Sequence, residues 1–396
     1  MREVKELTDT YHTPNYKRFD RVFVRGEGSC LFDEEGRKYL DFLTGISVTV
    51  LGHSDPQVVA AAVSQAEKLF HVSNLFYVPS QAALLKELAA VFPWKGKVFF
   101  CNSGSEAVEG AIKLVRKFRK DRGKGGHKIV SFRGSFHGRT YGSLSATAQE
   151  KLHNGFEPML PGFSYVERGD RAGYLKALED DACGVLFEPV QGEGGVFPFE
   201  RDFLDFVCKE AAEREVVVIC DEIQSGMGRT GTFFAFEQFG IVPQVITMAK
   251  GIANGLPLGV VAAVEEVAST FTPGSHGSTF GGNPVSCAAA VEVVRKVREP
   301  GFLENVAGKG RHLRENLEAL MRDIPEIVSV RGIGLMLGVV FSSPCKNLVD
   351  KCLEKGLIVN CTEETVLRLL PPLTVEGDEI DEAVGILRSV LEEGVS

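Results

Sequence analysis

The sequence lacks any run of apolar residues that approaches the ~20 needed to cross a membrane as a helix. Its first residues, MREVKELTDTYH, contain no apolar segment of the kind that secretory signals carry. It has no block of Lys and Arg, and its formal net charge of -9 argues against binding to nucleic acid or anionic membranes. These absences predict a globular protein of the cytoplasm.

The nine cysteines include no C-x-x-C pair, and their number is odd. A disulfide framework or a cysteine-rich zinc site would need paired spacings that this chain does not have. We therefore expect reduced thiols and no bound metal. No internal repeat is visible, and 396 residues are too many for one ordinary core, so we expect two domains.

The middle of the chain alternates between apolar runs, which predict strands, and stretches with helical periodicity. The expected strands are 98–101, 128–132, 184–187, 216–220 and 245–249, and the expected helices include 56–70, 105–119 and 203–214. Strands separated by helices favour a parallel sheet with helices on both faces. The sequence therefore predicts an α/β fold for this part of the chain.

The two ends of the chain show a different pattern. Short antiparallel strands are expected between Phe23 and Asp41, where apolar runs are split by turns. Beyond residue 284 the expected helices are 284–297, 309–321 and one from about Asp378, and the expected strands are 328–331, 336–341 and 365–370. We expect residues 1–55 and 285–396 to build a small α+β domain beside a large domain of residues 56–284.

Polar residues follow several of the expected parallel strands. In open α/β sheets, ligands bind beyond the carboxyl ends of the strands, so chemistry is expected at these positions. In CNSGSEAVEG, Gly104 would allow a ligand close to the backbone. Ser105 could cap a helix whose first N–H groups bind an anion. An ordinary helix cap would have the same sequence, so this segment alone does not indicate a phosphate site.

Two further strand ends carry an acid and an amine. Asp221 follows the apolar run VVVIC, and a carboxylate there can hydrogen-bond a protonated ring nitrogen. Lys250 follows VITMA, and a lysine that points into a crevice at a sheet end suggests a Schiff-base amine. The alternatives are an acid that caps a loop and a lysine that extends to solvent. Together, the acid and the amine are what pyridoxal 5′-phosphate (PLP) requires of a protein.

Other segments carry groups that suit the same ligand. Glu188 ends the strand GVLF, and in RGSFHGRT Phe136 offers an aromatic face while Arg139 offers a planar fork for a carboxylate. The turn GSHGSTFGGNP can supply hydroxyl and backbone donors to a phosphate. GMGRTG matches the dinucleotide pattern but neither follows its strand directly nor opens a long helix. A nicotinamide-dependent dehydrogenase is therefore the weaker alternative.

The order of these segments resembles the class III aminotransferases. NSGSEA, FHGRT, EPVQGEGG, DEIQSGMGRTG, AKGIANGLPLG and HGSTFGGNP stand in the family's order, and the likeness covers the whole chain. Stretches such as TGISVTVLGH and FEPMLPGF are similar to the acetylornithine subfamily. The resemblance implies fold type I of the PLP enzymes and a homodimer whose active sites are shared between the subunits.

The resemblance also implies a role for each matching residue. Lys250 would carry PLP as a Schiff base, and Asp221 would pair with its ring nitrogen. The other cofactor contacts would come from Gly104, Ser105, Phe136, Gln224 and, from the neighbouring subunit, Thr279. Arg139 would bind a substrate carboxylate with Ser278 beside it. Glu188 and Arg368 would form a pair that opens to admit 2-oxoglutarate.

The reaction that the resemblance implies moves the terminal amino group of N-acetylornithine to 2-oxoglutarate. The products are N-acetylglutamate 5-semialdehyde and glutamate, and the step belongs to arginine biosynthesis. Ornithine aminotransferases have a substrate-contacting Tyr where this chain has Ile46, which argues against free ornithine. The alternatives are other ω-amines, among them succinylornithine, 4-aminobutyrate and ornithine, and an aminomutase or racemase of the same fold.

Overall fold

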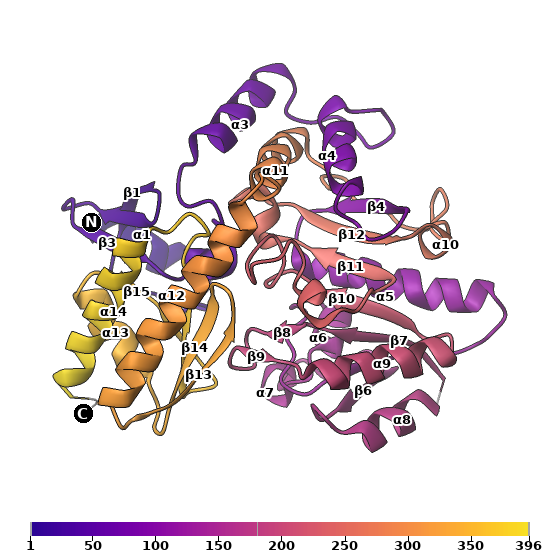
Figure 1. The fold of residues 1–396 in the computed structure, drawn as a ribbon. Coiled ribbons are helices and arrows are strands. Elements are labelled where there is room, and N and C mark those ends of the chain that lie inside the picture. The colour runs from indigo at the N-terminus through magenta and orange to yellow at the C-terminus, as the bar shows by residue number, and fades with distance from the viewer. Residues whose placement is uncertain (1, 180, 395–396) are drawn as a thin grey trace.

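The computed structural model describes residues 2–179 and 181–394, and Figure 1 shows a larger α/β region beside a smaller one. The larger region contains a seven-stranded sheet with the strand order β4-β12-β11-β10-β7-β5-β6. Its strands are β4 (Gly96–Cys101), β5 (Lys128–Phe132), β6 (Phe163–Val166), β7 (Ala182–Phe187), β10 (Val217–Asp221), β11 (Val245–Met248) and β12 (Gly259–Val264). β12 runs antiparallel to both neighbours, and the other pairs are parallel.

Helices cover both faces of this sheet. Along β10, Val217 and Ile219 pack with residues of α5, whereas Val218 and Cys220 pack on the opposite face in the cluster that includes α9. Because both faces are buried, the strand is a continuous apolar run rather than an alternating one. The helices of the larger region are α3 (Pro56–Lys68), α4 (Pro79–Ala89), α5 (Gly104–Asp121), α6 (Tyr141–Ala146), α7 (Glu150–His153), α8 (Arg171–Glu179), α9 (Arg201–Glu213), α10 (Glu265–Ala268) and α11 (Pro284–Val297).

The smaller region combines both ends of the chain. One of its sheets has the order β1-β2-β3-β15, in which β15 pairs parallel with β3, and the other has the order β13-β14-β17-β16. The strands are β1 (Phe23–Glu27), β2 (Cys30–Asp33), β3 (Lys38–Asp41), β13 (Ile327–Ile333), β14 (Met336–Phe341), β15 (Leu357–Ile358), β16 (Asn360–Thr362) and β17 (Val366–Leu369). The helices are α1 (Arg2–Tyr11), α12 (Phe302–Asp323), α13 (Lys346–Glu354) and α14 (Gly377–Glu392). The expected domain limits at residues 55 and 284 stay predictions.

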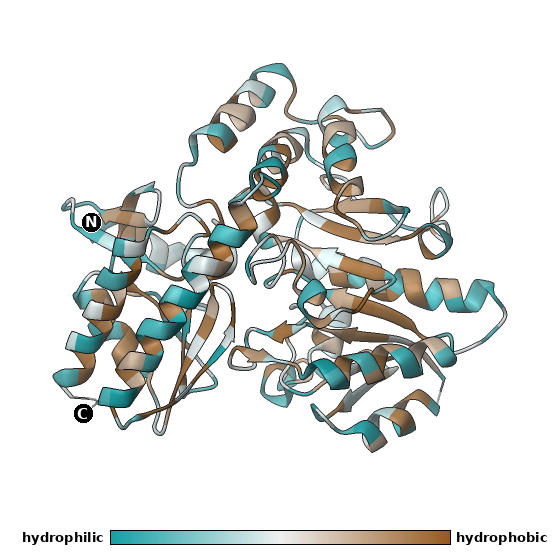
Figure 2. Cartoon of the chain, in the orientation of Figure 1, coloured by the Kyte–Doolittle hydropathy of each residue, from teal (hydrophilic) through white to brown (hydrophobic). Residues whose placement is uncertain are grey.

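The distribution of hydropathy follows these layers. Figure 2 shows hydrophobic residues along the strands of the large sheet and hydrophilic residues on the outward turns of α9, α12 and α14. Local signals fix where several helices begin. Asp55 Oδ1 accepts hydrogen bonds from the backbone N–H groups of Gln57 and Val58, and Pro56 occupies the first turn of α3. In the described part of the chain, no helix is long and apolar enough to span a membrane.

Candidate active site

A cavity of about 310 Å³ lies at the carboxyl ends of β10 and β11, against the start of α5. Its lining includes the expected residues Gly104, Ser105, Phe136, Glu188, Asp221, Gln224 and Lys250, together with His137. Four other expected residues, Arg139, Ser278, Thr279 and Arg368, lie outside the lining. Side chains from widely separated segments of the chain therefore meet at the edge of the sheet where ligands bind in this type of fold.

The start of α5 forms the anion-binding end of the cavity. The cap of α5 is Ser103 rather than the expected Ser105, because Ser103 Oγ accepts a hydrogen bond from Glu106 N at 3.2 Å. Ser105 lies in the first turn, and its Oγ accepts from the backbone N–H of Arg139 at 3.1 Å. A Cβ at Gly104 would lie 3.0 Å from the Ile223 side chain, so the glycine permits this close packing. The first N–H groups of this 18-residue helix suit a phosphate.

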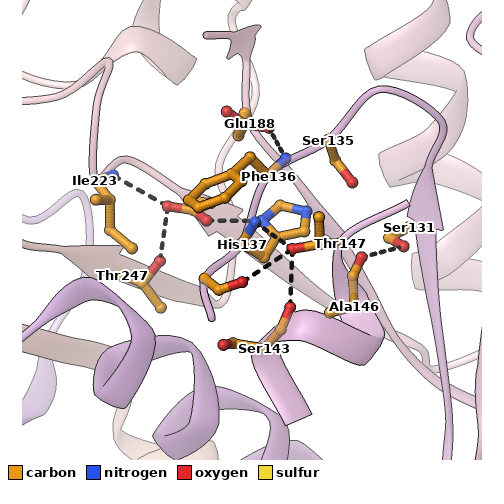
Figure 3. Close-up of polar contacts among 12 residues, drawn as sticks. Ser131, Ser135, Phe136, His137, Ser143, Ala146, Thr147, Glu188, Ile223 and Thr247 are labelled. Carbon is orange, nitrogen blue, oxygen red and sulfur yellow. Dashed lines mark hydrogen bonds and ion pairs between the residues drawn. The ribbon is translucent and has the colours of Figure 1, made fainter. Parts of the chain in front are cut away.

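Asp221 is held rigidly at the floor of the cavity. Its Oδ2 accepts from Nδ1 of His137 at 2.7 Å, and its Oδ1 accepts from Ile223 N at 3.1 Å and Thr247 Oγ1 at 3.3 Å. In Figure 3, dashed lines from His137, Ile223 and Thr247 end on one carboxylate beside the Phe136 ring. Both side chains of the His137–Asp221 pair are buried, and His137 Nε2 has no partner among the described residues. A carboxylate fixed in this way presents its charge to a cationic ring nitrogen.

His137 was not predicted from the sequence. Its position directly after Phe136 in the FHGRT segment was the available signal, but nothing there indicated that it would reach Asp221. Phe136 lines the cavity, and the guanidinium carbon of Arg139 lies 5.4 Å from the centroid of the Phe136 ring. Arg139 itself is exposed, so its charge lies at the mouth of the site and not within it.

Lys250 follows the end of β11 at Met248 after one intervening residue, and it lines the cavity. Its backbone φ is 46°, which lies in the left-handed region. Residues other than glycine adopt this region only at a cost in free energy. Burial lowers the pKa of the Lys250 amine, and the negative charge of Glu193 opposes this effect. A lowered pKa increases the fraction of neutral amine, which is the nucleophilic form.

Arg368 is paired with Glu193, and the expected ion pair between Glu188 and Arg368 is not formed. Nη1 of the fully buried Arg368 donates to Glu193 Oε1 at 2.6 Å and to Gln224 Oε1 at 3.0 Å. Its Nε donates to Asn360 Oδ1 at 3.1 Å. Nη2 has no partner among the described residues. The guanidinium is therefore fixed by three contacts and keeps donor capacity for a carboxylate.

The two acids of EPVQGEGG have opposite environments. Glu188 accepts hydrogen bonds from Phe136 N at 2.9 Å and Gly192 N at 3.2 Å, and burial raises its pKa to about 7. Burial also acts to raise the pKa of Glu193, but the charge and hydrogen bond of Arg368 outweigh it and lower that pKa. Glu193 is thus the ionised partner of Arg368, and Glu188 is bound by backbone N–H groups.

The turn at Ser278 and Thr279 does not reach into the cavity of its own chain. Ser278 Oγ accepts from Asn102 Nδ2 at 3.2 Å and from Gly281 N at 2.9 Å, which holds the turn near the start of α5. Thr279 is exposed and is not among the residues that line the cavity. The structure therefore brings Ser278 to the edge of the site and leaves Thr279 on the surface.

Ile46 lies in a left-handed turn, α2 (Thr44–Ser47), whose four residues all have a φ between 50° and 68°. Its side chain packs against a buried apolar cluster that includes Val190, Met336 and Leu370. Ile46 therefore has apolar neighbours, and it is not among the residues that line the cavity. A β-branched residue in the left-handed region is strained, so the surrounding structure must hold the turn in place.

Arg229 of the GMGRTG segment holds that turn. It is fully buried, its Nε donates to Ser47 Oγ at 3.0 Å, and its Nη1 donates to the carbonyls of Leu335, at 3.2 Å, and Pro371. Residues 226–231 open no long helix, because only the short 3₁₀ helix η1 (Ala235–Phe239) follows. The segment thus serves as an internal brace, and its geometry does not match a dinucleotide loop.

Comparison with known proteins identifies the family. The profile described as aminotransferase class-III matches residues 11–391. The chain belongs to the class-III aminotransferases. It is 49% identical over 382 residues to the acetylornithine aminotransferase of Aquifex aeolicus strain VF5, an overlap of 96% of this chain and 100% of that protein.

Solved structures agree with this assignment. This aminotransferase superposes on the N-acetylornithine aminotransferase of Stenotrophomonas maltophilia K279a with a TM-score of 0.85 and 35% identity, covering 98% of each chain. It superposes on the ornithine aminotransferase of Toxoplasma gondii ME49 with a TM-score of 0.94 and 29% identity, covering 99% of this chain and 95% of the other. The fold is therefore fold type I of the PLP enzymes, as expected from the sequence.

The enzyme is a PLP-dependent aminotransferase, and its cavity fits that cofactor. The helix start at Gly104 suits the phosphate, Asp221 suits a protonated ring nitrogen, and Lys250 offers an amine for the aldehyde. A Cβ at Gly138 would lie 2.5 Å from Ser105 Oγ, so only glycine leaves this hydroxyl beside the phosphate end. The volume lies at the small end of the range of about 300–1,000 Å³ for sites of small ligands.

Proposed function

We propose that this aminotransferase moves the terminal amino group of N-acetylornithine to 2-oxoglutarate, releasing N-acetylglutamate 5-semialdehyde and glutamate. Relatives named acetylornithine aminotransferase, 49% and 45% identical over nearly the whole chain, support this choice. The observation that carries it is the packing of the Ile46 side chain against a buried apolar cluster.

PLP, when bound, supplies an aldehyde that links to an amine and a ring that accepts an electron pair from the adjoining carbon. Asp221, oriented by His137, holds the proton on the ring nitrogen and keeps the ring electron-poor. Lys250 Nζ would hold the cofactor and, when free, would take the proton from the donor carbon that bears the amino group. Because the same amine could give the proton back, Lys250 would be the general base and the general acid.

Glu193 and Arg368 allow one site to accept two unlike substrates. While Glu193 is paired with Arg368, the positive charge is neutralised and the terminal amine of the donor can enter. When Glu193 turns away, Nη1 and the unpartnered Nη2 of Arg368 can bind the α-carboxylate of 2-oxoglutarate as a fork. Arg139, at the mouth of the cavity, would hold the distal carboxylate of either substrate.

Discrimination between N-acetylornithine and ornithine would arise at Ile46. The charged α-amine of ornithine would face an apolar side chain and remain unpaired, at a cost of about 1–3 kcal/mol. Acetylation removes that charge and its cost. Since about 1.4 kcal/mol corresponds to a factor of ten, kcat/KM should favour N-acetylornithine by roughly 10- to 100-fold.

The active enzyme would be a homodimer that shares its two sites. Exposed apolar side chains support this: Phe70, Leu75, Phe76, Tyr77 and Phe280 are each at least 62% exposed. Asn74 Nδ2 donates to the carbonyls of Ser278, at 3.0 Å, and Gly281, at 2.9 Å, so the loop that bears these residues is tied to the turn that bears Thr279. A partner that covered this surface would receive Thr279 at its phosphate end.

The test is a competition between N-acetylornithine and ornithine, with glutamate formation from 2-oxoglutarate as the readout. Wild-type enzyme should prefer the acetylated amine, and Ile46→Tyr should narrow the gap by improving ornithine. Lys250→Ala should abolish turnover with every donor. Equal kcat/KM for both amines in the wild type would contradict the substrate assignment and leave the PLP chemistry intact.

A further inference from the structure

Two cysteines that no sequence motif connects lie in contact in the smaller region. Cys345 immediately precedes α13 and Cys361 lies in β16, and their Sγ atoms are 3.0 Å apart. The structure describes all nine cysteines, and no other pair among them has sulfur atoms in hydrogen-bond contact. Since a disulfide holds its sulfur atoms about 2.05 Å apart, an approach of about 1 Å would join this pair.

The two thiols differ in access and in reactivity. Cys361 is partly exposed and borders a cavity of about 810 Å³ between residues 17–21 and α13, whereas Cys345 is buried. The hydrogen bond from the Cys345 thiol lowers the pKa of Cys361 to about 7 and raises the pKa of Cys345. Cys361 is therefore the thiol that a small molecule can reach and the one that ionises first.

Cys361 directly follows Asn360, and Asn360 contacts Arg368, the arginine proposed to bind the substrate carboxylate. Asn360, next to Cys361 on β16, lies opposite Arg368 on β17 and accepts the 3.1 Å hydrogen bond from its Nε. The turn between the two strands has two non-glycine residues in the left-handed region, Glu363 with a φ of 46° and Glu364 with a φ of 59°. Such a turn is strained. We expect it to adjust when β16 is displaced slightly, and Asn360 would move because it belongs to β16.

Cys345 also fastens this hairpin directly. Its backbone N–H donates to the carbonyl of Glu364 at 2.8 Å, and the Cys361 thiol donates to the same carbonyl at 3.1 Å. A covalent bond between the two sulfur atoms would draw the outer strand of the hairpin toward the start of α13. Arg368, on the inner strand β17, stays bonded to β14 on its other side. The strand that moves is therefore the one that carries Asn360.

We propose that Cys345 and Cys361 form a disulfide by exchange with a small-molecule disulfide, and that this bond weakens the hold of Arg368 on the α-carboxylate of 2-oxoglutarate. The Cys361 thiolate attacks the small disulfide, forms a mixed disulfide and releases one thiol. Cys345, after giving up its proton, attacks Cys361 Sγ, forms the protein disulfide and releases the second thiol. The protein loses two electrons and two protons, and the small disulfide gains both. The effect on Arg368 rests on the proposed function, whereas the exchange itself does not.

The first experiment measures the exchange without using activity. Native holoenzyme is incubated with an excess of glutathione disulfide, and its intact mass and disulfide-linked peptides are determined before and after reduction. The expected product lacks two hydrogen atoms and links the peptides of Cys345 and Cys361. Cys208 is the other partly exposed cysteine, so Cys208→Ser is the matched control and should give the same link. An unchanged mass, or an adduct on Cys208 alone, would overturn the exchange.

Two variants separate the attacking thiol from the resolving one. Cys345→Ser should stop at a stable mixed disulfide on Cys361, because no second thiol can displace it. Cys361→Ser should gain no adduct at either position. If one variant fails to fold, the other still tests the order of attack. A stable adduct on Cys345 in the Cys361→Ser enzyme would contradict the order stated above.

The second experiment measures the effect on Arg368. In the oxidised wild type, KM for 2-oxoglutarate should rise by up to about tenfold, because one hydrogen bond to a charged group is strained. The rate of the donor half-reaction should change little, and reduction should restore the original KM. In the Cys361→Ser enzyme, the oxidant should not change KM for 2-oxoglutarate. A linked protein with an unchanged KM would refute the coupling to Arg368, and equal losses in both half-reactions would point to general damage.

Discussion

At the scale of single residues, two carboxyl groups five positions apart carry different tasks. Glu188 accepts hydrogen bonds from two backbone N–H groups, and its pKa is about 7. Glu193 pairs with the guanidinium of Arg368. Only the second acid would gate the carboxylate site proposed at Arg368, because only Glu193 occupies the Arg368 donors that a substrate carboxylate would need.

We expect Glu193→Gln to uncouple the two half-reactions. Without its anionic partner, Arg368 would be free to bind carboxylates, so KM for 2-oxoglutarate should fall. The value of kcat/KM for the amine donor should drop by about tenfold or more, because the donor carboxylate can then bind Arg368 and place the amine away from the cofactor. Glu188→Gln is the matched control and should leave the ratio of the two half-reactions nearly unchanged. Stopped-flow measurement of each half-reaction decides between them. A larger change of this ratio in Glu188→Gln would favour the Glu188–Arg368 pairing that the family resemblance implied.

Glu222 gives a second prediction at this scale, for stability. It is buried behind Asp221, and burial raises its pKa from 4.5 to about 7. The folded state therefore keeps a proton that the unfolded state releases, and the free energy of unfolding falls as the pH rises from about 4.5 to about 7. Glu222→Gln carries no such charge and should be more stable than the wild type at pH 8, by at most about 3 kcal/mol, at about 1.4 kcal/mol per pKa unit.

The glutamine can keep the existing contacts of Glu222. Its carbonyl can accept from Phe236 N, and the Ser225 hydroxyl can turn to accept from the new amide. Urea unfolding of the holoenzyme at pH 5 and pH 8 is the measurement. The advantage of the variant should shrink at pH 5, and an equal difference at both pH values would show that ionisation of Glu222 is not its cause.

At the scale of elements, the left-handed turn α2 is held in part by the hydrogen bonds of Ser47. Ser47 Oγ accepts from Arg229 Nε at 3.0 Å and donates to the carbonyl of Gln224 at 3.1 Å. It thereby links the turn that carries Ile46 to both halves of the DEIQSGMGRTG segment. A buried polar contact therefore helps to position the turn that carries Ile46, in addition to the apolar packing of its side chain.

Ser47→Ala should destabilise the fold by about 1–3 kcal/mol, because it leaves Arg229 Nε and the Gln224 carbonyl without a partner. It should also reduce the preference for N-acetylornithine over ornithine, since Ile46 loses its fixed place. Thr49→Val is the matched control: Thr49 Oγ1 is buried with no partner among the described residues, so its removal should cost little. Urea unfolding and the competition assay together test this. If Thr49→Val were as unstable as Ser47→Ala, loss of the two Ser47 hydrogen bonds would not explain the instability of Ser47→Ala.

The same scale shows what the sequence could and could not reveal. The strands before Asp221 and Lys250 are continuous apolar runs, so their ends, and with them the acid and the amine, could be predicted. The strands β6 and β12 were not predicted, and the antiparallel direction of β12 could not be, because an apolar run has the same composition in either direction. The helices α1 and α4 were not predicted. α1 is largely polar, and α4 carries too weak a periodicity to stand out.

Contacts between distant segments were also beyond the sequence. Glu188 and Glu193 belong to one glycine-rich stretch, and only the fold shows which of them faces Arg368. His137 reaches Asp221 across a separation of 84 residues. Local patterns locate the end of a strand, but they do not contain the packing that decides which side chain meets which.

For the whole molecule, the exposed apolar surface around residues 70–77 is the feature that requires an explanation. We expect Phe76→Glu to sediment as a monomer and to bind PLP more weakly, because a buried charge opposes the interface and each phosphate end loses the partner subunit's Thr279. Phe156→Glu is the control, since Phe156 is similarly exposed, at 53% against 63% for Phe76, but lies in a different loop. Sedimentation and PLP titration are the measurements. A wild-type monomer with full activity would contradict the shared site.

The residues proposed for the reaction and for carboxylate binding lie on two different sheets. Asp221 and Lys250 stand at the ends of adjacent strands of the large sheet, whereas Arg368 stands on a strand of the smaller region. With the role proposed for Arg368, mutations in the smaller region would change which acid is accepted without disturbing how the amino group is detached. A lineage that inherits this arrangement can acquire new substrates step by step and remain a working catalyst throughout. The separation of the two sheets gives a physical basis for the evolvability of such an enzyme.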